Sequence, residues 1–417
     1  MIQLIRGFKD ILPDETQTWR HIEDTAIALF QSFGFKEIRL PIVEKTELFQ
    51  RSIGEHTDIV EKEMYTFAGS KGELITLRPE ATASVVRSYI QQKLYAKEPI
   101  QKLYTIGPMF RRERPQKGRY RQFYQINAEV FGIESPYIDA QLIFMLWTVF
   151  MRLEITGLSV QLNSLGCPAC RPSFKEALAS HLASKTGSLC SDCVRRQDKN
   201  PLRVLDCKVP SCQEVIDDAP SMVDYLCDDC ARHFNAVQSG LASQGIPFEL
   251  NPRLVRGLDY YTRTAFEIQT DALGAQNAIA GGGRYDMLVK MLGGPEQPAI
   301  GFAIGLDRLV ALVMQGLAQK ELTPDIFIAA LGEKVREKTF EWSCALGQEG
   351  IRTEIDFSDK SLKALMKRAN RIGAANVLIV GTQEIEEGAV LLRNMQTKEQ
   401  VTIPIEGMVN HIKKHLT

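Results

Sequence analysis

LYTIGPMFRRERPQKGRYRQFYQINAEVFG, residues 103–132, is the stretch that decides the fold. Its two β-prone runs, LYTIGPMFRRE and RQFYQINAEVFG, are joined by RPQKGRY, which contains a proline, a glycine and several charges. The pattern predicts a long antiparallel hairpin. Of the eleven residues from Arg111 to Arg121, six are basic and one is acidic, so the tip could neutralise phosphates. Taken alone, the loop could equally be a solvated, charged turn.

The composition is that of a soluble globular protein with two or three domains. The chain has 417 residues, of which 44% are hydrophobic and 24% are charged, and its net charge is −1. This balance excludes a globally basic coat, so a nucleic-acid partner has to be met by a local patch. The N-terminal stretch lacks a secretory pattern, and the longest apolar run, residues 142–151, is shorter than the ~20 residues that span a membrane. We therefore expect a cytoplasmic protein with no membrane partner.

The pattern around the hairpin mixes helices and strands. Apolar residues from Trp19 to Phe33 recur at helical spacing before Gly34, and Asp139–Leu153 reads as a second, buried helix. IGFAIGLDRLVALVM, residues 300–314, is also expected to be helical. The strand-like runs are EIRLPIVE (37–44), SVQLNSLG (159–166), PFELNPRLVRG (247–257), AFEIQT (265–270) and AIAGG (278–282).

After Thr323 and Pro324 the predicted strands and helices begin to alternate. Three strand-like runs, DIFIAAL, IRTEIDF and NVLIVG, are separated by the helical stretches KVREKTFEWSCALGQ and SLKALMKRANRIG. This alternation predicts a separate, small α/β domain at the C-terminus.

Four further motifs carry polar residues that could do chemistry, and each has a plainer alternative. In LITLRPEATASVVR (74–87), Glu80 and Thr82 fall where a strand gives way to a helix, so they could hold an ammonium group or cap the helix. In RGLDYYTRTAFEI (256–268), Arg256 precedes the flexible Gly257 and two tyrosines. GGGRYD (281–286) could admit a ligand close to the backbone or form a tight turn. Arg308 could bind phosphate or lie on the surface, and Phe123 could stack on a base or belong to the core.

Eight of the nine cysteines fall between Cys167 and Cys230, as four close pairs. Three pairs have the two-residue spacing and one the four-residue spacing of tetrahedral thiolate zinc sites. Four pairs suffice for two structural zinc sites; the alternative is reduced cysteines or adventitious disulfides. The spacing leaves open which pairs share a metal, and we expect the first two pairs to combine and the last two to combine. The pairs are Cys167 and Cys170, Cys190 and Cys193, Cys207 and Cys212, and Cys227 and Cys230.

The order of these motifs resembles that of the histidyl-tRNA synthetases, a family of class II aminoacyl-tRNA synthetases, over essentially the whole chain. The segments that carry the resemblance are TLRPEAT, GPMFRRERPQKGRYRQFYQ, NAEVFG, LVRGLDYYTRTAFE, GGGRYD and GFAIGLDRLV. It implies an α+β fold: a class II antiparallel catalytic sheet flanked by helices, and a homodimer built around EIRLPIVE with Pro41. The implied domains are a catalytic domain (1–166 and 233–322), an inserted cysteine-rich segment (167–232) and an α/β anticodon-binding domain (323–417).

The resemblance also implies an activity. L-histidine and ATP, with one Mg²⁺, would give histidyl-adenylate and pyrophosphate, and a terminal ribose hydroxyl of the histidine tRNA would then take the histidyl group and release AMP.

The roles of single residues follow from the same resemblance. Arg256 and Arg111 would hold the α-phosphate as catalytic groups, Glu113 would contact the adenine end, Phe123 would stack on adenine, and Arg308 would reach the γ-phosphate. Glu80, Thr82 and Gln125 would bind the α-ammonium group, Glu129 and Tyr261 would read the imidazole, and Tyr260 would line the pocket. The tip residues Arg112, Gln116, Lys117 and Arg119 would contact the tRNA.

Two positions depart from the family pattern. Arg112 stands where many relatives have histidine, and Ala81 stands where glycine is more usual. They put the contacts to the tRNA end and the geometry of one turn in doubt.

Two other readings compete with the synthetase. One is the synthetase-like regulatory subunit of ATP phosphoribosyltransferase, which lacks the C-terminal domain and tends to lose the two histidine motifs. The other is a metal-bearing nucleic-acid-binding module, which leaves Arg256 and Arg308 without a role.

Overall fold

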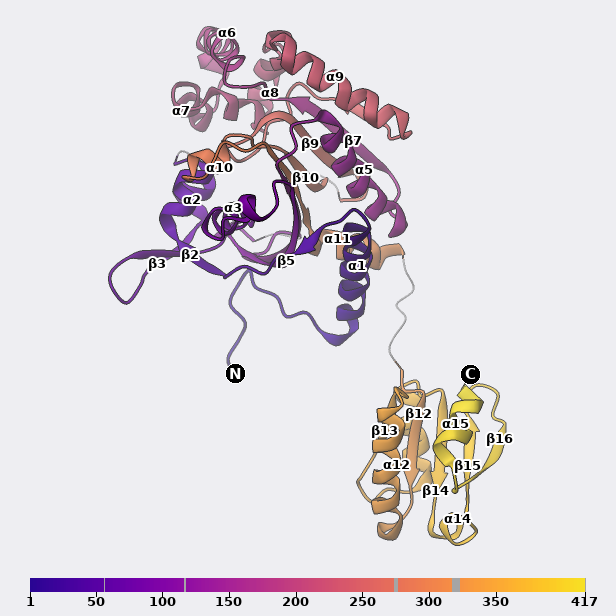
Figure 1. Ribbon diagram of the computed structural model, residues 1–417. Helices are drawn as coiled ribbons and strands as arrows, with labels where there is room; N and C mark the ends of the chain where they lie inside the picture. Colours follow the sequence, from indigo (N-terminus) through magenta and orange to yellow (C-terminus); the bar gives the residue numbers. More distant parts are fainter. Residues whose placement is uncertain (56, 116–117, 274–276, 317–322, 417) are drawn as a thin grey trace. The chain divides into compact units, whose positions relative to one another are not determined.

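The computed structural model describes residues 1–55, 57–115, 118–273, 277–316 and 323–416, which divide into two compact units, residues 1–319 and 320–417 (Figure 1). No helix in these described ranges has both the length and the hydrophobicity needed to cross a membrane. Each unit has its own sheet and its own core.

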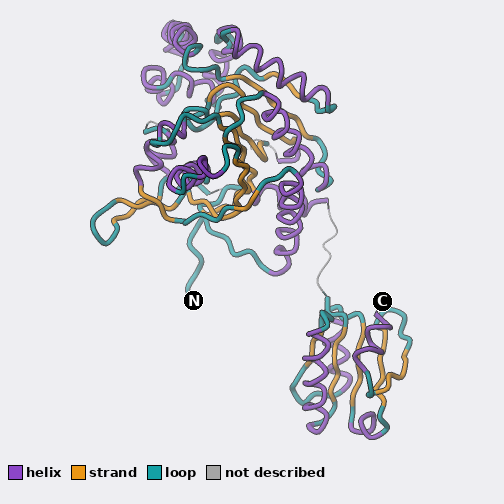
Figure 2. Tube along the Cα trace, viewed as in Figure 1, coloured by secondary structure: helices purple, strands orange, loops and turns teal. Residues whose placement is uncertain are grey.

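Eight of the described strands of the larger unit form one sheet with the order β1-β5-β6-β11-β10-β9-β7-β8. Figure 2 draws the strands in orange. The central strands, from β5 to β7 in this order, pair antiparallel, while β1 and β8 add parallel pairs at the two edges. The strands are β1 (Lys36–Glu37), β5 (Gln101–Phe110), β6 (Gln122–Phe131), β7 (Leu158–Ser164), β8 (Phe248–Leu250), β9 (Thr262–Thr270), β10 (Ala278–Arg284) and β11 (Ala299–Gly305).

The predicted hairpin is confirmed as β5 and β6, which pair from Gln101 and Phe131 to Phe110 and Gln122. Along β6 successive side chains point to opposite faces of the sheet. Ile126, Ala128 and Val130 enter the main core, so Gln125, Asn127 and Glu129 lie on the other face. One strand thus supplies both a core surface and a row of polar groups.

Helices cover both faces of this sheet (Figure 1). On one face α1, α5, α9 and α11 build the main apolar core, and on the other α3 and α10 pack with Tyr260 and Tyr261 in a second cluster. The helices are α1 (Pro13–Ser32), α3 (Thr82–Gln91), α5 (Pro136–Arg152), α9 (Asp228–Ser243), α10 (Leu288–Met291) and α11 (Leu306–Gly316).

A three-stranded antiparallel sheet, with the order β2-β4-β3, lies beside α2 (Thr46–Ile53). Its strands are β2 (Val43–Lys45), β3 (Tyr65–Ala68) and β4 (Leu74–Leu77); the π-helix η1 (Ile59–Glu63) precedes β3, and α4 (Leu94–Lys97) follows α3.

The cysteine-rich segment is a set of short helices whose small core is built largely from cysteine sulfurs. Its elements are α6 (Arg171–Ser184), η2 (Thr186–Ser188), α7 (Ser191–Lys199), η3 (Pro201–Asp206), α8 (Pro210–Asp217) and η4 (Met222–Tyr225), followed by α9.

The smaller unit is an α/β domain with a five-stranded sheet in the order β13-β12-β14-β15-β16. Apolar clusters cover both faces of its buried strands, as expected for a sheet flanked by helices. Its elements are β12 (Ile326–Ala330), η6 (Glu333–Val335), α12 (Arg336–Gln348), β13 (Thr353–Ile355), α13 (Leu362–Arg371), β14 (Asn376–Val380), α14 (Thr382–Glu386), β15 (Ala389–Asn394), β16 (Gln400–Pro404) and α15 (Met408–Leu416).

Four expectations about local structure were wrong in detail. Residues 300–305, expected to begin a helix, belong to β11, because a short apolar run fits a buried strand as well as a helix. EIRLPIVE is strand only at its ends, since residues 38–42 lie outside β1 and β2. The strand expected over 247–257 is confined to Phe248–Leu250. Of the two alternatives for GGGRYD, the tight turn is wrong, because its glycines lie within β10, which continues the strand predicted for AIAGG.

Candidate active site

A cavity of about 590 Å³ opens on the face of the sheet that carries Gln125. β5, β6, β9, β10 and β11, with the start of α11, supply most of its wall. The lining includes Arg111, Glu113, Arg119, Phe123, Gln125, Asp206, Lys208, Arg256, Glu267, Gly281 and Arg308. The structure therefore brings together every described residue to which the family resemblance assigns a nucleotide role.

Arg256 is fixed on this wall by two neighbours. Its Nη1 donates to Oε2 of Glu267 over 2.8 Å, and its guanidinium carbon lies 5.9 Å from the centre of the Tyr261 ring. Burial lowers the pKa of Arg256, but Tyr261 and Glu267 more than offset this effect and hold the pKa above its ordinary value. The side chain is a permanent cation in a preorganised place.

The glycines of β10 make room for that cation. A Cβ atom at Gly281 would lie 2.5 Å from Nη1 of Arg256. At Gly301, opposite Glu129 on the next strand pair, a Cβ would lie 1.6 Å from Oε2 of Glu129. These strands need glycine because charged side chains lie flat against their backbone.

Two further cavity arginines, Arg111 and Arg308, are positioned by backbone carbonyls. Arg111 donates from Nε to the carbonyl of Pro79 over 2.9 Å, and its guanidinium lies 5.2 Å from the Phe123 ring centre. Arg308 donates from Nη1 to the carbonyl of Ala278 over 2.6 Å. Burial, followed by repulsion from Arg119, lowers the pKa of Arg308. With Arg119 and Lys208, five cationic side chains thus line one cavity, which favours a polyanionic ligand.

Glu129 lies at the centre of a second, enclosed group of polar side chains. It is 1% exposed and accepts hydrogen bonds from the hydroxyl of Thr82 over 2.6 Å and from that of Tyr285. Burial raises the pKa of Glu129 to about 8, although both hydroxyls oppose the shift. A carboxyl so poised can accept or donate a proton to a ligand near neutral pH.

Glu80 caps the start of α3, as the plainer interpretation of TLRPEAT predicted. Its two carboxylate oxygens accept from the backbone amides of Thr82 over 2.7 Å and of Ala83 over 2.9 Å. Burial nevertheless raises the pKa of Glu80. Capping orients the carboxylate and leaves it available to a ligand.

Tyr260 and Tyr261 close the same region, with ring centres 4.7 Å apart. The predicted histidine-site residues Glu80, Thr82, Glu129, Tyr260 and Tyr261 are therefore neighbours. Arg256 adjoins this group because it lies beside the ring of Tyr261.

Some buried polar atoms of the site have no hydrogen-bond partner among the described residues. They include Oε1 of Gln125 and Nε of Arg256. Buried polar groups are almost always paired, so partnerless atoms on a cavity wall mark places where a ligand supplies the partner.

The residues predicted at the hairpin tip are only partly placed. Arg119 lies 3.3 Å from Glu113 on the cavity wall, while Arg112 is exposed and stacks near the ring of Tyr65. Gln116 and Lys117 lie outside the described residues.

Sequence reasoning missed several groups that the structure adds to the site. Tyr285 and Glu267 were read only as parts of motifs, yet they hold Glu129 and Arg256. Behind them Asp139, fully buried, accepts from Arg284 and His233 over 2.9 and 2.8 Å. In the sequence, the arginine and tyrosine of GGGRYD could have pointed to these groups, since charged and aromatic residues rarely end a glycine-rich strand without a partner.

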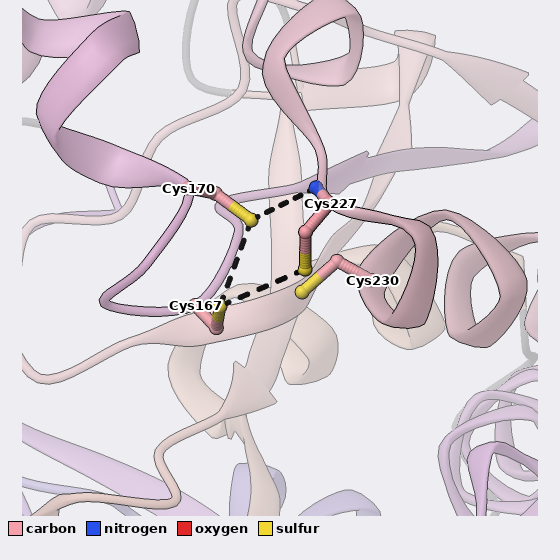
Figure 3. Close-up of side chains that lie close together, drawn as sticks. All are labelled: Cys167, Cys170, Cys227 and Cys230. Carbon is pink, nitrogen blue, oxygen red and sulfur yellow. Dashed lines mark hydrogen bonds between the residues drawn. The ribbon is translucent and has the colours of Figure 1, made fainter.

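The eight cysteines form two groups of four, and within each group the ligand atoms lie within 4.8 Å of one another. The grouping we expected was wrong: the first and last pairs combine, and the two middle pairs combine. The reason is topological, because α9 returns Cys227 and Cys230 to the start of α6, beside Cys167 and Cys170 (Figure 3). We call these groups the outer cluster (Cys167, Cys170, Cys227, Cys230) and the inner cluster (Cys190, Cys193, Cys207, Cys212).

The sulfur distances distinguish a metal site from disulfides. In the outer cluster Sγ of Cys167 lies 3.6 Å from that of Cys170 and 4.0 Å from that of Cys227, and in the inner cluster Cys190 and Cys207 are 3.9 Å apart. A disulfide requires about 2.05 Å. Four sulfurs around one zinc at ~2.3 Å lie about 3.8 Å apart. The geometry fits a tetrahedral metal.

Comparison with known proteins shows which family the chain is similar to. A family model described as histidyl-tRNA synthetase matches residues 7–309, and one described as an anticodon-binding domain matches residues 325–415. A histidine–tRNA ligase of Desulforapulum autotrophicum is 62% identical, over 100% of this chain and 98% of its own length. One of Geobacter sulfurreducens is 52% identical, over 97% of this chain and 98% of its own length.

Comparison with solved structures points to the same family. The crystal structure of apo histidyl-tRNA synthetase from Staphylococcus aureus has a TM-score of 0.84 at 36% identity and covers 99% of this chain and 100% of its own. An ATP phosphoribosyltransferase regulatory subunit/histidyl-tRNA synthetase from Bacillus halodurans has a TM-score of 0.66 at 17% identity, covering 91% of this chain and 98% of its own, and shares the fold alone. With both family models matched in order, the chain belongs to the histidyl-tRNA synthetase family.

Proposed function

We propose that the chain is a cytoplasmic histidine–tRNA ligase, which joins L-histidine to its tRNA through histidyl-adenylate. The observation that carries the proposal is the meeting of two sites: a cavity lined by four arginines, and an enclosed group around Glu129 that adjoins it through Tyr261 and Arg256. The first suits a nucleotide triphosphate and the second a small amino acid with a polar ring.

In the first step, a carboxylate oxygen of histidine attacks the α-phosphorus of ATP and pyrophosphate leaves. Negative charge shifts on the α-phosphate as the bond breaks, and Arg256 and Arg111 are placed to stabilise it. A fixed guanidinium is effective because it need not reorganise during the reaction. Arg308 holds the far phosphate, Phe123 stacks on the adenine ring, and Glu113 contacts its amino end.

Histidine is selected by groups that match its polar atoms. Glu80, Thr82 and Gln125 receive the α-ammonium group, and Gln125 offers a buried oxygen without a partner among the described residues. Glu129 and Tyr261 face the two imidazole nitrogens, and Tyr260 closes the pocket. A site built for hydrogen bonds rejects analogues that leave its buried groups unpaired.

One Mg²⁺ fits the nucleotide cavity. The carboxylate donor there, beside the phosphate-facing Arg256, is Glu267 on β9. Magnesium prefers such oxygen ligands together with substrate phosphates. When bound, it would neutralise charge on the phosphates of ATP.

In the second step, a terminal ribose hydroxyl of the histidine tRNA attacks the carbonyl carbon of the adenylate and AMP leaves. We assign residues 323–417 to anticodon binding, residues 1–166 and 233–322 to catalysis, and residues 167–232 to a cysteine-rich insertion. The basic tip with Arg112, Gln116, Lys117 and Arg119 supplies the contacts to the acceptor end.

We further propose a homodimer built around Pro41. The apolar side chains of Ile42, Val43, Phe67 and Leu74 are exposed on or beside the small sheet. A groove of about 730 Å³ lies beside them, lined by Pro41, Leu48, Arg87 and Leu292 among others. Clustered exposed apolar residues next to a groove are typical of a protein interface.

Each cysteine cluster, we propose, holds one structural zinc. Four thiolates close the coordination sphere, so neither metal has an open position for substrate. The backbone amides of Cys227 and Cys190 donate to sulfurs of Cys170 and Cys212 over 3.2 and 3.1 Å. Such bonds stabilise thiolate ligands. Metal analysis of protein purified under reducing conditions should find two zinc ions per chain; a content well below one, with eight titratable thiols, would refute this assignment alone.

Histidine-dependent exchange of labelled pyrophosphate into ATP tests the central proposal. The chain should catalyse exchange with L-histidine and not with other amino acids, and should charge histidine tRNA. A regulatory subunit or a metal-bearing binding module would bind ligands without exchange, so its absence in folded, metal-loaded protein would overturn the proposal.

A further inference from the structure

Each cysteine cluster is linked to the backbone of the RGLDYY segment, residues 256–261, by an arginine that lies close to the cluster in sequence. Arg171 directly follows Cys170 of the outer cluster. Arg203 lies in η3, between Cys193 and Cys207 of the inner cluster. Each arginine donates to a main-chain carbonyl at one end of the segment.

Arg171 holds the C-terminal end. Its Nη2 donates to the carbonyl of Tyr261, and its Nε donates to that of Leu165 over 3.3 Å. The guanidinium therefore ties the start of α6 to the residue whose ring lies beside Arg256.

Arg203 holds the N-terminal end. Its side chain is 11% exposed, and its Nη1 donates to the carbonyl of Arg256 over 3.2 Å. Its Nη2 lies 3.6 Å from Asp58, to which Arg196 also donates over 2.8 Å. Asn200 adds a bond of 2.9 Å to Asp259 in the middle of the segment.

The segment has little other support from regular structure. Residues 256–261 belong to no helix or strand, and β9 begins only at Thr262. Asp259 is tied by its backbone amide to Ile53 over 3.1 Å. The bonds from Arg171 and Arg203 are therefore a substantial part of what fixes the backbone under Arg256.

The inner cluster also reaches the nucleotide cavity directly. Asp206 and Lys208, the two neighbours of Cys207, both line it. Cys207 itself is buried and belongs to the small core of the insertion. A change in the position of this ligand would move part of the cavity wall.

We propose that the two cysteine clusters, each closed by a metal ion, position the 256–261 segment through Arg171 and Arg203 and so set the rate of adenylate formation. The insertion is then a brace for the active site in addition to any contact with tRNA. Arg171 and Arg203 are positioning residues, since they act through the backbone of Arg256 and Tyr261. The inference rests on the proposed function and on zinc in the clusters.

The first test removes each arginine and keeps all the cysteines. In Arg203→Ala and Arg171→Ala, the maximal rate of histidine-dependent pyrophosphate exchange should fall about tenfold, because small misplacements of a catalytic group cost 10- to 10²-fold. The KM values for histidine and ATP should change by less than about threefold. Bound zinc should stay at the wild-type content. Arg203→Lys, which keeps one donor, should recover part of the rate.

Arg195→Ala is the matched control. Arg195 lies on α7 in the same segment, is exposed, and pairs with Asp192 one turn away. This variant removes the same charge and one ion pair but no bond to the segment, so its exchange rate should equal that of the wild type.

A second measurement does not depend on activity. In Cys212→Ser, which opens the inner cluster, backbone amides of peptides covering residues 254–262 should exchange hydrogen faster, and peptides of β15 and β16 should not. If this variant does not fold, the arginine variants still decide the matter.

Wild-type exchange rates in both arginine variants would overturn the proposal, and so would unchanged amide exchange over residues 254–262 in folded, zinc-depleted Cys212→Ser. Failure of the proposed function would look different: the unmodified chain would show no histidine-dependent pyrophosphate exchange at all.

Discussion

The two units of the chain treat buried charge differently. In the larger unit Glu80, Glu129, Asp139 and Arg284 are all less than 5% exposed. In the smaller unit Asp356 is the buried charged residue among those described, and the sheet packs against apolar clusters. Buried ionisable groups oppose folding unless they are paired.

This difference suggests that the larger unit carries out the reaction and that the smaller unit provides a binding surface. A sheet that retains several destabilising groups beside a cavity is organised for a reaction, since perturbed ionisable groups cluster at functional sites. A unit with an apolar core and charges outside has a surface for binding and a fold that tolerates change. Each prediction below changes one side of this contrast.

Removing the central cation should have the largest effect. Arg256→Ala should lower the rate of adenylate formation by about 10²–10³, because one preorganised charge donor is worth ~3 to 4 kcal/mol at the transition state. ATP and histidine binding should change only a few-fold. Single-turnover kinetics and equilibrium binding measure the two separately, with exposed Arg152→Ala at the end of α5 as the control. Equal losses in binding and in rate would make Arg256 a binding residue.

Deleting the smaller unit should separate the two steps. A chain ending at Pro324 should lose about 10²-fold in kcat/KM for tRNA charging, since several phosphate contacts disappear with it. Pyrophosphate exchange should remain within a few-fold of the wild type. If both activities fell together, the smaller unit would instead stabilise the dimer or the catalytic fold.

Glu129 makes the larger unit sensitive to pH. Its folded pKa of about 8 lies above the ordinary value near 4.5, so the folded state binds the proton more tightly than the unfolded state. Stability from this group is present at low pH and is lost as pH rises from about 4.5 to 8.

Glu129→Gln removes that loss. Relative to wild type, the variant should gain about 2 kcal/mol of unfolding free energy between pH 6 and pH 8, at ~1.4 kcal/mol per pH unit while the group titrates. Denaturant unfolding of the ligand-free protein at the two pH values measures it. A constant difference between the two proteins would mean that Glu129 is ionised in the folded state.

In the smaller unit, the stability contributed by a buried carboxylate should change with pH in the opposite direction and by a smaller amount. Hydrogen bonds from Ser358, with Arg368 and Lys360 nearby, hold the pKa of Asp356 below its usual range. Its contribution is therefore present above about pH 4 and is lost on acidification.

Asp356→Asn should destabilise the smaller unit by about 1 kcal/mol at pH 7 and by less at pH 3. Amide exchange of β12 and β14 in the full chain measures it, and pyrophosphate exchange should not change. An effect on pyrophosphate exchange would show that the two units are coupled.

The sequence predicted the parts of the fold that local patterns determine. The β5–β6 hairpin followed from two β-prone runs and a Pro- and Gly-containing loop, and the helices α12 and α13 followed from apolar spacing. The prediction for residues 300–305 was wrong because a run of four apolar residues and two glycines fits either a strand or a helix. Only their pairing with β10 and β6 decides between the two.

The site was predictable where a residue type is itself unusual, and not where its partner is ordinary. Arg256 and Arg308 stand out between glycines and apolar residues, whereas Glu267 alternates like any strand residue. The cysteine grouping failed for a related reason. Spacing fixes which two sulfurs are adjacent, but the path of the short helices between them decides which pairs meet.

The nested arrangement of the cysteine clusters gives the insertion an order of assembly. Cys190 and Cys212 of the inner cluster are 22 residues apart, whereas Cys167 and Cys227 of the outer cluster are 60 apart. A shorter loop loses less chain entropy on closing. On a chain leaving the ribosome, all four inner ligands are also available before Cys227 has been made. If each cluster holds zinc as proposed, the inner site takes its metal first and forms a compact group of short helices, and the outer site closes once Cys227 and Cys230, at the start of α9, have followed.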